Sequence, residues 1–107
     1  KNAMHAVVTD IDTPFTKHEY NIYEPDSDQV IDPETIDLVF VPLIICDHRG
    51  YRVGYGKGFY DRYLTQCRAD CIKIGFSFFE PIPMLEDAKE FDVPLDLCIT
   101  PQNVYVF

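Results

Sequence analysis

IDLVFVPLIICD, at residues 36–47, is a nearly continuous apolar run in a chain of 107 residues. Strands that are buried on both faces of a parallel sheet have this character. Pro42 lies inside the run, and a proline cannot donate a hydrogen bond to a neighbouring strand. We therefore expect a buried strand that ends near Val41, where the chain bends into the next segment.

The segment after this run, GYRVGYGKGFYDRYL at 50–64, contains four of the five glycines of the chain. The apolar residues that follow recur with the period of a helix, at Tyr60, Tyr63, Leu64 and Cys67. We expect an amphipathic helix here, and CIKIGFSFF at 71–79 predicts the next strand. A strand, a loop, a helix and a strand in this order form a βαβ unit around a glycine-rich loop.

The rest of the sequence fits the α/β class, with a mostly parallel sheet and flanking helices in a single domain over residues 1–107. Further strands are expected at 3–9, 97–100 and 103–107. The segments 10–35 and 81–96 are interrupted by prolines and acidic residues, so they read as irregular connections.

Composition excludes several classes of function. A net charge of −9 argues against a nucleic-acid surface. No apolar run approaches the roughly eighteen residues of a membrane span. The N-terminus has no basic-then-apolar signal layout, so we expect a cytoplasmic protein. The four cysteines are then expected to be reduced thiols.

Positive charge is concentrated around the glycines. Residues 1–40 hold nine acidic and two basic side chains, and residues 72–107 hold six acidic and two basic ones. Residues 41–71, by contrast, hold three acidic and five basic side chains. An island of positive charge in an acidic protein is a reasonable site for a small anion. Arg52 and Lys57 lie inside the loop and are the cations expected to face that anion.

A glycine loop between a strand and the start of a helix is suited to phosphate. Glycine amides can approach an anion without side-chain obstruction, and the helix start adds partial positive charge. Arg52 and Lys57 add charged donors, and such loops lie at the carboxyl end of the sheet in α/β proteins. The spacing matches neither the dinucleotide fingerprint nor the Walker loop. A tight structural turn is the alternative interpretation.

Asp61 follows the last glycine of the loop by three residues. One interpretation is an acidic residue favoured by the helix dipole in the first turn. The other is a Mg²⁺ ligand beside bound phosphates, because Mg²⁺ takes one or two carboxylates together with phosphate oxygens. A second acid is then needed, and Asp92 and Asp96 both precede a predicted strand.

Three blocks of the sequence together resemble one enzyme family. They are DLVFVPLIICDHRGYRVGYGKGFYDRYL at 37–64, IGFSF at 74–78 and FDVPLDLCIT at 91–100, in that order. The combination closely resembles the 5-formyltetrahydrofolate cyclo-ligases, also called methenyltetrahydrofolate synthetases, over roughly residues 20–100. The resemblance implies an enzyme that uses MgATP to convert 5-formyltetrahydrofolate into 5,10-methenyltetrahydrofolate, with release of ADP and phosphate.

The resemblance also implies roles for individual residues. Arg52 and Lys57 would be catalytic, and Asp61 and Asp92 would hold Mg²⁺ beside the ATP phosphates. The positions implied to bind the cofactor are Arg52, Val53, Gly54, Tyr55, Gly56, Lys57, Gly58, Phe59 and Tyr60. Residues 55–59 would also border the pterin and the formyl group of the substrate.

Two positions depart from the family pattern. Tyr55 stands where the family usually has Arg, and Phe59 stands where it usually has Tyr. Phe59 can stack on a flat pterin but cannot hydrogen-bond to it. These departures keep open a second hypothesis, a non-catalytic nucleotide- or folate-binding module with the same fold. A phosphate-binding α/β domain of unrelated role is a third interpretation, which the order of the three blocks disfavours.

The chain begins just before the middle strand of the family, and its first residue is Lys1. We therefore expect it to be the C-terminal portion of a cyclo-ligase-like domain, with the N-terminal half absent. Such a chain would expose sheet edges and apolar surface, which favours self-association. We expect little or no catalytic activity from it alone.

Overall fold

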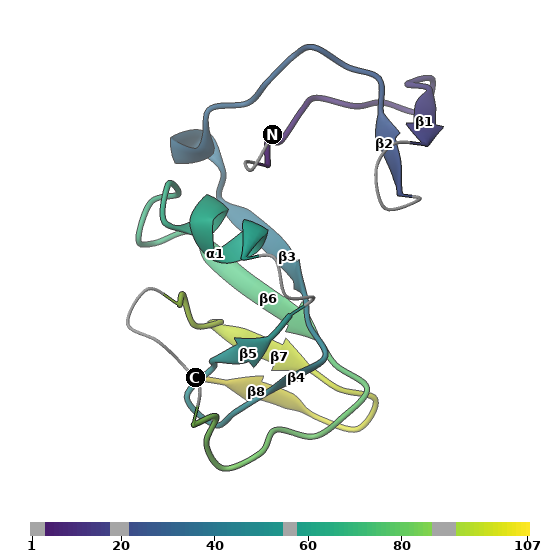
Figure 1. Ribbon diagram of the computed structural model, residues 1–107. Helices are drawn as coiled ribbons and strands as arrows, with labels where there is room; N and C mark the ends of the chain where they lie inside the picture. The colour runs from purple at the N-terminus through teal and green to yellow at the C-terminus, as the bar shows by residue number, and fades with distance from the viewer. Residues whose placement is uncertain (1–3, 18–21, 55–57, 87–91) are drawn as a thin grey trace.

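The centre of the molecule is a four-stranded sheet with the strand order β3-β6-β7-β8 (Figure 1). The structure, a computed structural model, describes residues 4–17, 22–54, 58–86 and 92–107. The sheet strands are β3 (Leu38–Pro42), β6 (Ile72–Phe76), β7 (Leu97–Ile99) and β8 (Val104–Val106). β3, β6 and β7 run parallel, and β8 is antiparallel to β7. The prediction of an α/β fold with a mostly parallel sheet is confirmed.

The apolar run at 36–47 forms two strands instead of one. Pro42 is the last residue of β3 and lies opposite Phe76, so the strand ends one residue later than expected. The run continues into β4 (Ile45–Cys46), which pairs antiparallel with β5 (Arg52–Val53). This small ribbon was not expected, because strands of two residues are too short to show a period in the sequence.

The predicted helix is present but shorter than its apolar pattern. α1 (Phe59–Leu64) begins after Gly58, whose φ of 70° lies in the left-handed region that favours glycine. Cys67 lies beyond the helix, in a turn where its own amide donates a hydrogen bond to the carbonyl of Leu64. Within the described residues, the only other helical segment is one 3-10 turn (Pro33–Thr35), so several flanking helices are not seen. Neither segment is long and apolar enough to cross a membrane.

The N-terminal region differs from the expectation in two ways. The predicted strand at 3–9 is reduced, in its described part, to a single bridge between Val7 and Val30. The segment 10–35, expected to be irregular, contains a hairpin of β1 (Phe15–Lys17) and β2 (Tyr23–Pro25). The side chains of this hairpin are mostly exposed, so no alternation of apolar and polar residues marks it in the sequence.

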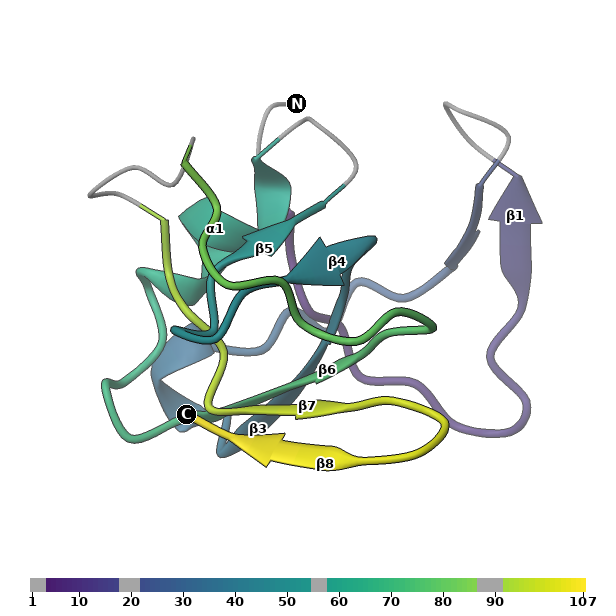
Figure 2. The ribbon, with the colours of Figure 1, turned by 90° about the horizontal axis from the view of Figure 1, so that it is seen from below.

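The two faces of the sheet differ. α1 and the β4–β5 ribbon lie on the same side of the sheet (Figure 2). The buried apolar residues of the core on this side are Val41, Leu43, Cys46, Leu64, Leu95 and Cys98. The outer face carries apolar residues that are 41 to 77% exposed, namely Leu38, Phe40, Ile72, Phe76, Val104 and Val106. Four of the cofactor-binding residues expected from the sequence belong to these two elements, namely Arg52 and Val53 to β5 and Phe59 and Tyr60 to α1.

Candidate functional site

The turn between β4 and β5 is held against the segment that leads into β7. The carbonyl of Gly50 accepts a hydrogen bond from the amide of Leu95, at 2.7 Å. Gly50 has a φ of 90°, and a Cβ atom at this position would lie 2.5 Å from the carbonyl oxygen of Leu95. A glycine is therefore required here both by the backbone angle and by the close approach of the two segments.

Arg52, on β5, joins three segments of the chain. Its Nη1 donates to the carbonyl oxygen of Val93 at 2.8 Å, and its Nη2 lies 3.1 Å from Oδ1 of Asp61. The same Oδ1 atom accepts a hydrogen bond from the amide of Val93, also at 3.1 Å. The side chain of Arg52 is only 5% exposed, whereas that of Asp61 is 29% exposed. β5, α1 and the segment before β7 are thus connected through one guanidinium group.

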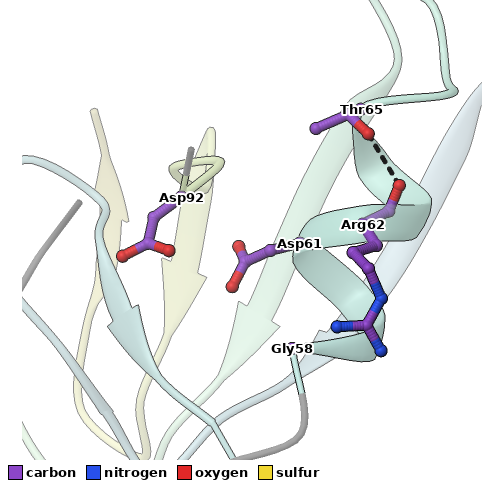
Figure 3. Close-up of a pocket in the computed structure, with 5 residues that line it drawn as sticks. All are labelled: Gly58, Asp61, Arg62, Thr65 and Asp92. Carbon is purple, nitrogen blue, oxygen red and sulfur yellow. Dashed lines mark hydrogen bonds between the residues drawn. The ribbon is translucent and has the colours of Figure 1, made fainter. Parts of the chain in front are cut away.

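Asp61 and Asp92 line one pocket of about 370 Å³, together with Gly58, Arg62 and Thr65. The carboxylate of Asp61 points from α1 toward Asp92, which comes from the segment that enters β7 at its amino end (Figure 3). The hydroxyl of Thr65 donates to the carbonyl of Arg62 at 2.7 Å, which closes the last turn of the helix. Two acidic side chains far apart in the sequence are therefore brought to one cavity.

The donor chemistry of this pocket fits a magnesium ion. Within the described part of the chain, no hydrogen-bond donor is found on Oδ2 of Asp61. Carboxylate oxygens are the ligands that Mg²⁺ prefers, and it is commonly bound by one or two of them with waters and phosphates. Across residues 4–17, 22–54, 58–86 and 92–107, no group of three or more His, Cys, Asp or Glu gathers. Among the residues that the structure describes, Asp61 and Asp92 are the acidic side chains that line the pocket.

The other acid considered from the sequence, Asp96, is engaged elsewhere. Its Oδ2 atom accepts the amide of Lys73 at 2.8 Å and lies 3.5 Å from the Lys73 ammonium. Asp96 therefore ties the start of β7 to β6, while Asp92 reaches the pocket.

Of the remaining expected cofactor-binding residues that the structure describes, Gly58 lines the pocket and the others do not. Val53 is exposed on the ribbon, and Tyr60 packs against the buried core. Phe59 lies under the guanidinium of Arg62, which is 5.1 Å from the centre of its ring. Among the described residues nothing lies within 4 Å of the position that a Cβ of Gly54 would take. Tyr55, Gly56 and Lys57 fall outside the described residues, so their roles stay predictions.

Asp47, which directly follows β4 and was not expected from the sequence to matter, is completely buried. Its Oδ1 accepts the amides of Arg49 and Tyr51, and its Oδ2 accepts the Arg49 guanidinium and the amide of Leu85. Burial acts to raise the pKa of Asp47, but these hydrogen bonds outweigh it and hold the pKa below its ordinary value. Its position directly after an apolar run was the available signal.

The parallel sheet, with a helix on one face and an acidic pocket beside it, defines an α/β protein with a site for a small ligand. The sequence matches the 5-formyltetrahydrofolate cyclo-ligase family over residues 1–101. The chain belongs to this family.

Individual relatives agree with this assignment. The 5-formyltetrahydrofolate cyclo-ligase of Mycoplasma pneumoniae is 37% identical over 94 residues, which cover 87% of this chain and 51% of the relative. The 5-formyltetrahydrofolate cyclo-ligase of Haemophilus influenzae is 33% identical over 91 residues, which cover 78% of this chain and 46% of the relative. The chain spans about half the length of these curated relatives.

Solved structures agree in fold. The 5,10-methenyltetrahydrofolate synthetase of Aquifex aeolicus aligns with a TM-score of 0.66 and 34% identity, covering 86% of this chain and 46% of that one. The 5,10-methenyltetrahydrofolate synthetase of Mycoplasma pneumoniae aligns with a TM-score of 0.60 and 38% identity, covering 73% of this chain and 47% of that one.

Proposed function

We propose that the protein converts 5-formyltetrahydrofolate into 5,10-methenyltetrahydrofolate in the cytoplasm, with consumption of MgATP and release of ADP and phosphate. The observation that carries the proposal is the convergence of Asp61 and Asp92 on one pocket, in a chain that belongs to the cyclo-ligase family. Because the chain spans about half of its relatives, the reaction is proposed for the protein with the complete family domain.

In this proposal Asp61 and Asp92 hold Mg²⁺, which supplies positive charge to the phosphate oxygens of ATP. The segment 53–60, with Lys57, binds the phosphates through its amides and its ammonium group. Catalysis of phosphoryl transfer consists mostly of positioning and of charge stabilisation, and these groups can supply both. Within the described part of the chain, no atom crowds the position of a Gly54 Cβ, which supports a close approach by the ligand.

The pterin is proposed to contact Phe59. One face of this ring is covered by the Arg62 guanidinium, so a flat pterin would stack on the opposite face. A phenyl ring supplies stacking but no hydrogen bond, and Arg62, which also lines the pocket, supplies charge nearby.

A second candidate function is a nucleotide- or folate-binding module without turnover. It is favoured by Tyr55 and Phe59, which replace a cation and a hydroxyl group at two positions of the family pattern. The two candidates share the pocket and differ only in chemistry, so a binding measurement alone does not separate them.

The test is an absorbance assay for methenyltetrahydrofolate formed from 5-formyltetrahydrofolate with MgATP, on the protein carrying the complete family domain. Turnover that disappears in Asp92→Asn, but persists in the surface variant Asp70→Asn, is the expected result. Mg²⁺-dependent binding of ATP without turnover would favour the binding module. Absence of both would overturn the proposal.

A further inference from the structure

We propose that Arg52 is a positioning residue, which holds the Asp61 carboxylate toward the pocket and does not itself bind phosphate. The inference rests on the proposed function only for the identity of the ligand, a magnesium–nucleotide complex. It assigns Arg52 a different task from Lys57, with which the sequence pattern grouped it.

The first argument is that the guanidinium is already engaged. Arg52 is 5% exposed, with Nη1 donating to Val93 and Nη2 paired with Asp61. A phosphate that took either nitrogen would have to displace a buried carbonyl or a carboxylate, and leaving a buried polar group unpaired is costly. A group that contacts an incoming ligand is expected to be more accessible than this.

The second argument is the closed arrangement of the three residues. Arg52 donates to the carbonyl of Val93, while the amide of Val93 and Nη2 of Arg52 both contact Oδ1 of Asp61. Two donors on one oxygen fix the carboxylate, which faces Asp92 across the pocket (Figure 3). Asp92 directly precedes Val93, so the same contacts also tie the backbone next to Asp92 to β5 and α1.

The third argument is electrostatic. Two carboxylates that face one cavity repel each other until a cation lies between them. The buried charge of Arg52 beside Asp61 offsets that repulsion. A lysine would keep the charge, but it lacks the planar fork that reaches Val93 and Asp61 together.

The test begins with a readout that needs no ligand. Hydrogen exchange at the Val93 amide is measured by NMR in the unaltered protein, in Arg52→Gln and Arg52→Lys, and in the control Arg68→Gln. Arg68 also pairs with carboxylates, those of Asp37 and Asp70, but on the surface. We expect exchange at Val93 to rise about tenfold in both Arg52 variants and to stay unchanged in the control. Unchanged exchange at Val93 in the Arg52 variants would overturn the proposal.

The second readout separates positioning from direct contact. Binding of ADP is measured with and without Mg²⁺ in Arg52→Lys, Asp61→Asn and the double variant. If Arg52 is a positioning residue, Arg52→Lys should need about ten times more Mg²⁺ for half-maximal binding of ADP, while its affinity for ADP without Mg²⁺ stays unchanged. The double variant should bind Mg–ADP no more weakly than Asp61→Asn alone. If Arg52→Lys weakened the binding of ADP equally with and without Mg²⁺, Arg52 would contact the phosphates directly, and the inference would be overturned. If the unaltered protein binds no Mg–ADP, the proposed function fails, and exchange at Val93 still decides the role of Arg52.

Discussion

Asp47 and Asp61 are each paired with an arginine of the β4–β5 ribbon region, but the two pairs are built in opposite ways. Asp47 is completely buried and its partner Arg49 is 42% exposed. Asp61 is 29% exposed and its partner Arg52 is 5% exposed. In the first pair the carboxylate is the inner member, and in the second pair the guanidinium is.

This inversion separates two tasks that the residue types alone do not distinguish. Both oxygens of Asp47 accept hydrogen bonds, so that carboxylate can only hold the turn and the Leu85 segment together. Asp61 uses one oxygen for Arg52 and Val93 and faces the pocket. An acid whose two oxygens both accept hydrogen bonds stabilises the fold. An acid with one oxygen that has no partner among the described residues, and that lines a cavity, can still bind a cation.

Removing the charge of Asp61 should produce the largest effect. In Asp61→Asn we expect kcat/KM for MgATP to fall by about 1000-fold, because a proposed metal ligand is lost. The free energy of unfolding should fall by about 1–2 kcal/mol, because the amide oxygen can still accept from Val93 but the buried Arg52 guanidinium loses its charged partner. Steady-state kinetics and urea unfolding test the two parts. A loss of stability as large as the one expected for Asp47→Asn would instead show that Asp61, like Asp47, mainly stabilises the fold.

Asp47→Asn should give the reverse outcome. We expect the free energy of unfolding to fall by about 3 kcal/mol, because a buried acceptor of several hydrogen bonds is replaced by an amide that carries donors. Urea unfolding followed by circular dichroism measures this loss. The residual activity of the folded fraction should remain within about fivefold of the unaltered protein, and a thousandfold loss there would erase the distinction between the two acids.

The stability provided by Asp47 should depend on pH. Its folded-state pKa lies below the value of about 3.9 expected in the unfolded chain. A lowered pKa contributes stability that is present above the unfolded-state pKa and is lost as the pH falls through the folded-state pKa. The difference in unfolding free energy between the unaltered protein and Asp47→Asn should therefore be constant from about pH 5 to 8 and shrink below about pH 4. The measurement is urea unfolding of both proteins at several pH values from about 3 to 8. If the difference in unfolding free energy stays constant below about pH 4, the prediction is wrong.

The smallest effect is expected at Arg49. Arg49→Gln should lower the free energy of unfolding by about 0.5–1 kcal/mol, because the Arg49 side chain is 42% exposed and the backbone amides still hold Asp47. Arg52→Gln, with its buried side chain, should cost more than this. Thermal unfolding of the two variants side by side measures the difference. Equal losses would show that burial of the arginine does not matter.

The strands and the helix could be predicted where apolar residues form a long run or repeat with the period of a helix over several turns. β3, α1 and β6 follow from the apolar run at 36–47, the helical repeat and the run at 71–79. The two-residue strands of the ribbon and the exposed hairpin of β1 and β2 carry no such period, and tertiary contacts fix them instead.

The sequence named two acids that the structure brings to one pocket, but it did not indicate the contacts around them. Asp61 was named from its place in the first turn of the predicted helix and Asp92 from its place before a predicted strand, together with the family pattern. Both line the pocket, and their role as Mg²⁺ ligands stays a prediction. The contact of Arg52 with Val93 joins residues 41 positions apart, which no local spacing can indicate. The distinction between Asp47 and Asp61 depends on burial and on donors from distant segments, so it required coordinates.

The outer face of the sheet has a consequence for the behaviour of this chain in solution. Its apolar side chains lie in register across the strands, as Phe40 does beside Ile74 and Leu97 beside Val106. The net charge of −9 keeps molecules apart by a repulsion that reaches about 10 Å at 0.1 M salt and only about 3 Å at 1 M. Colloidal stability should therefore decline as salt is added, because screening lets these faces meet. Dilute buffers of low ionic strength are the conditions in which we expect this chain to stay dispersed.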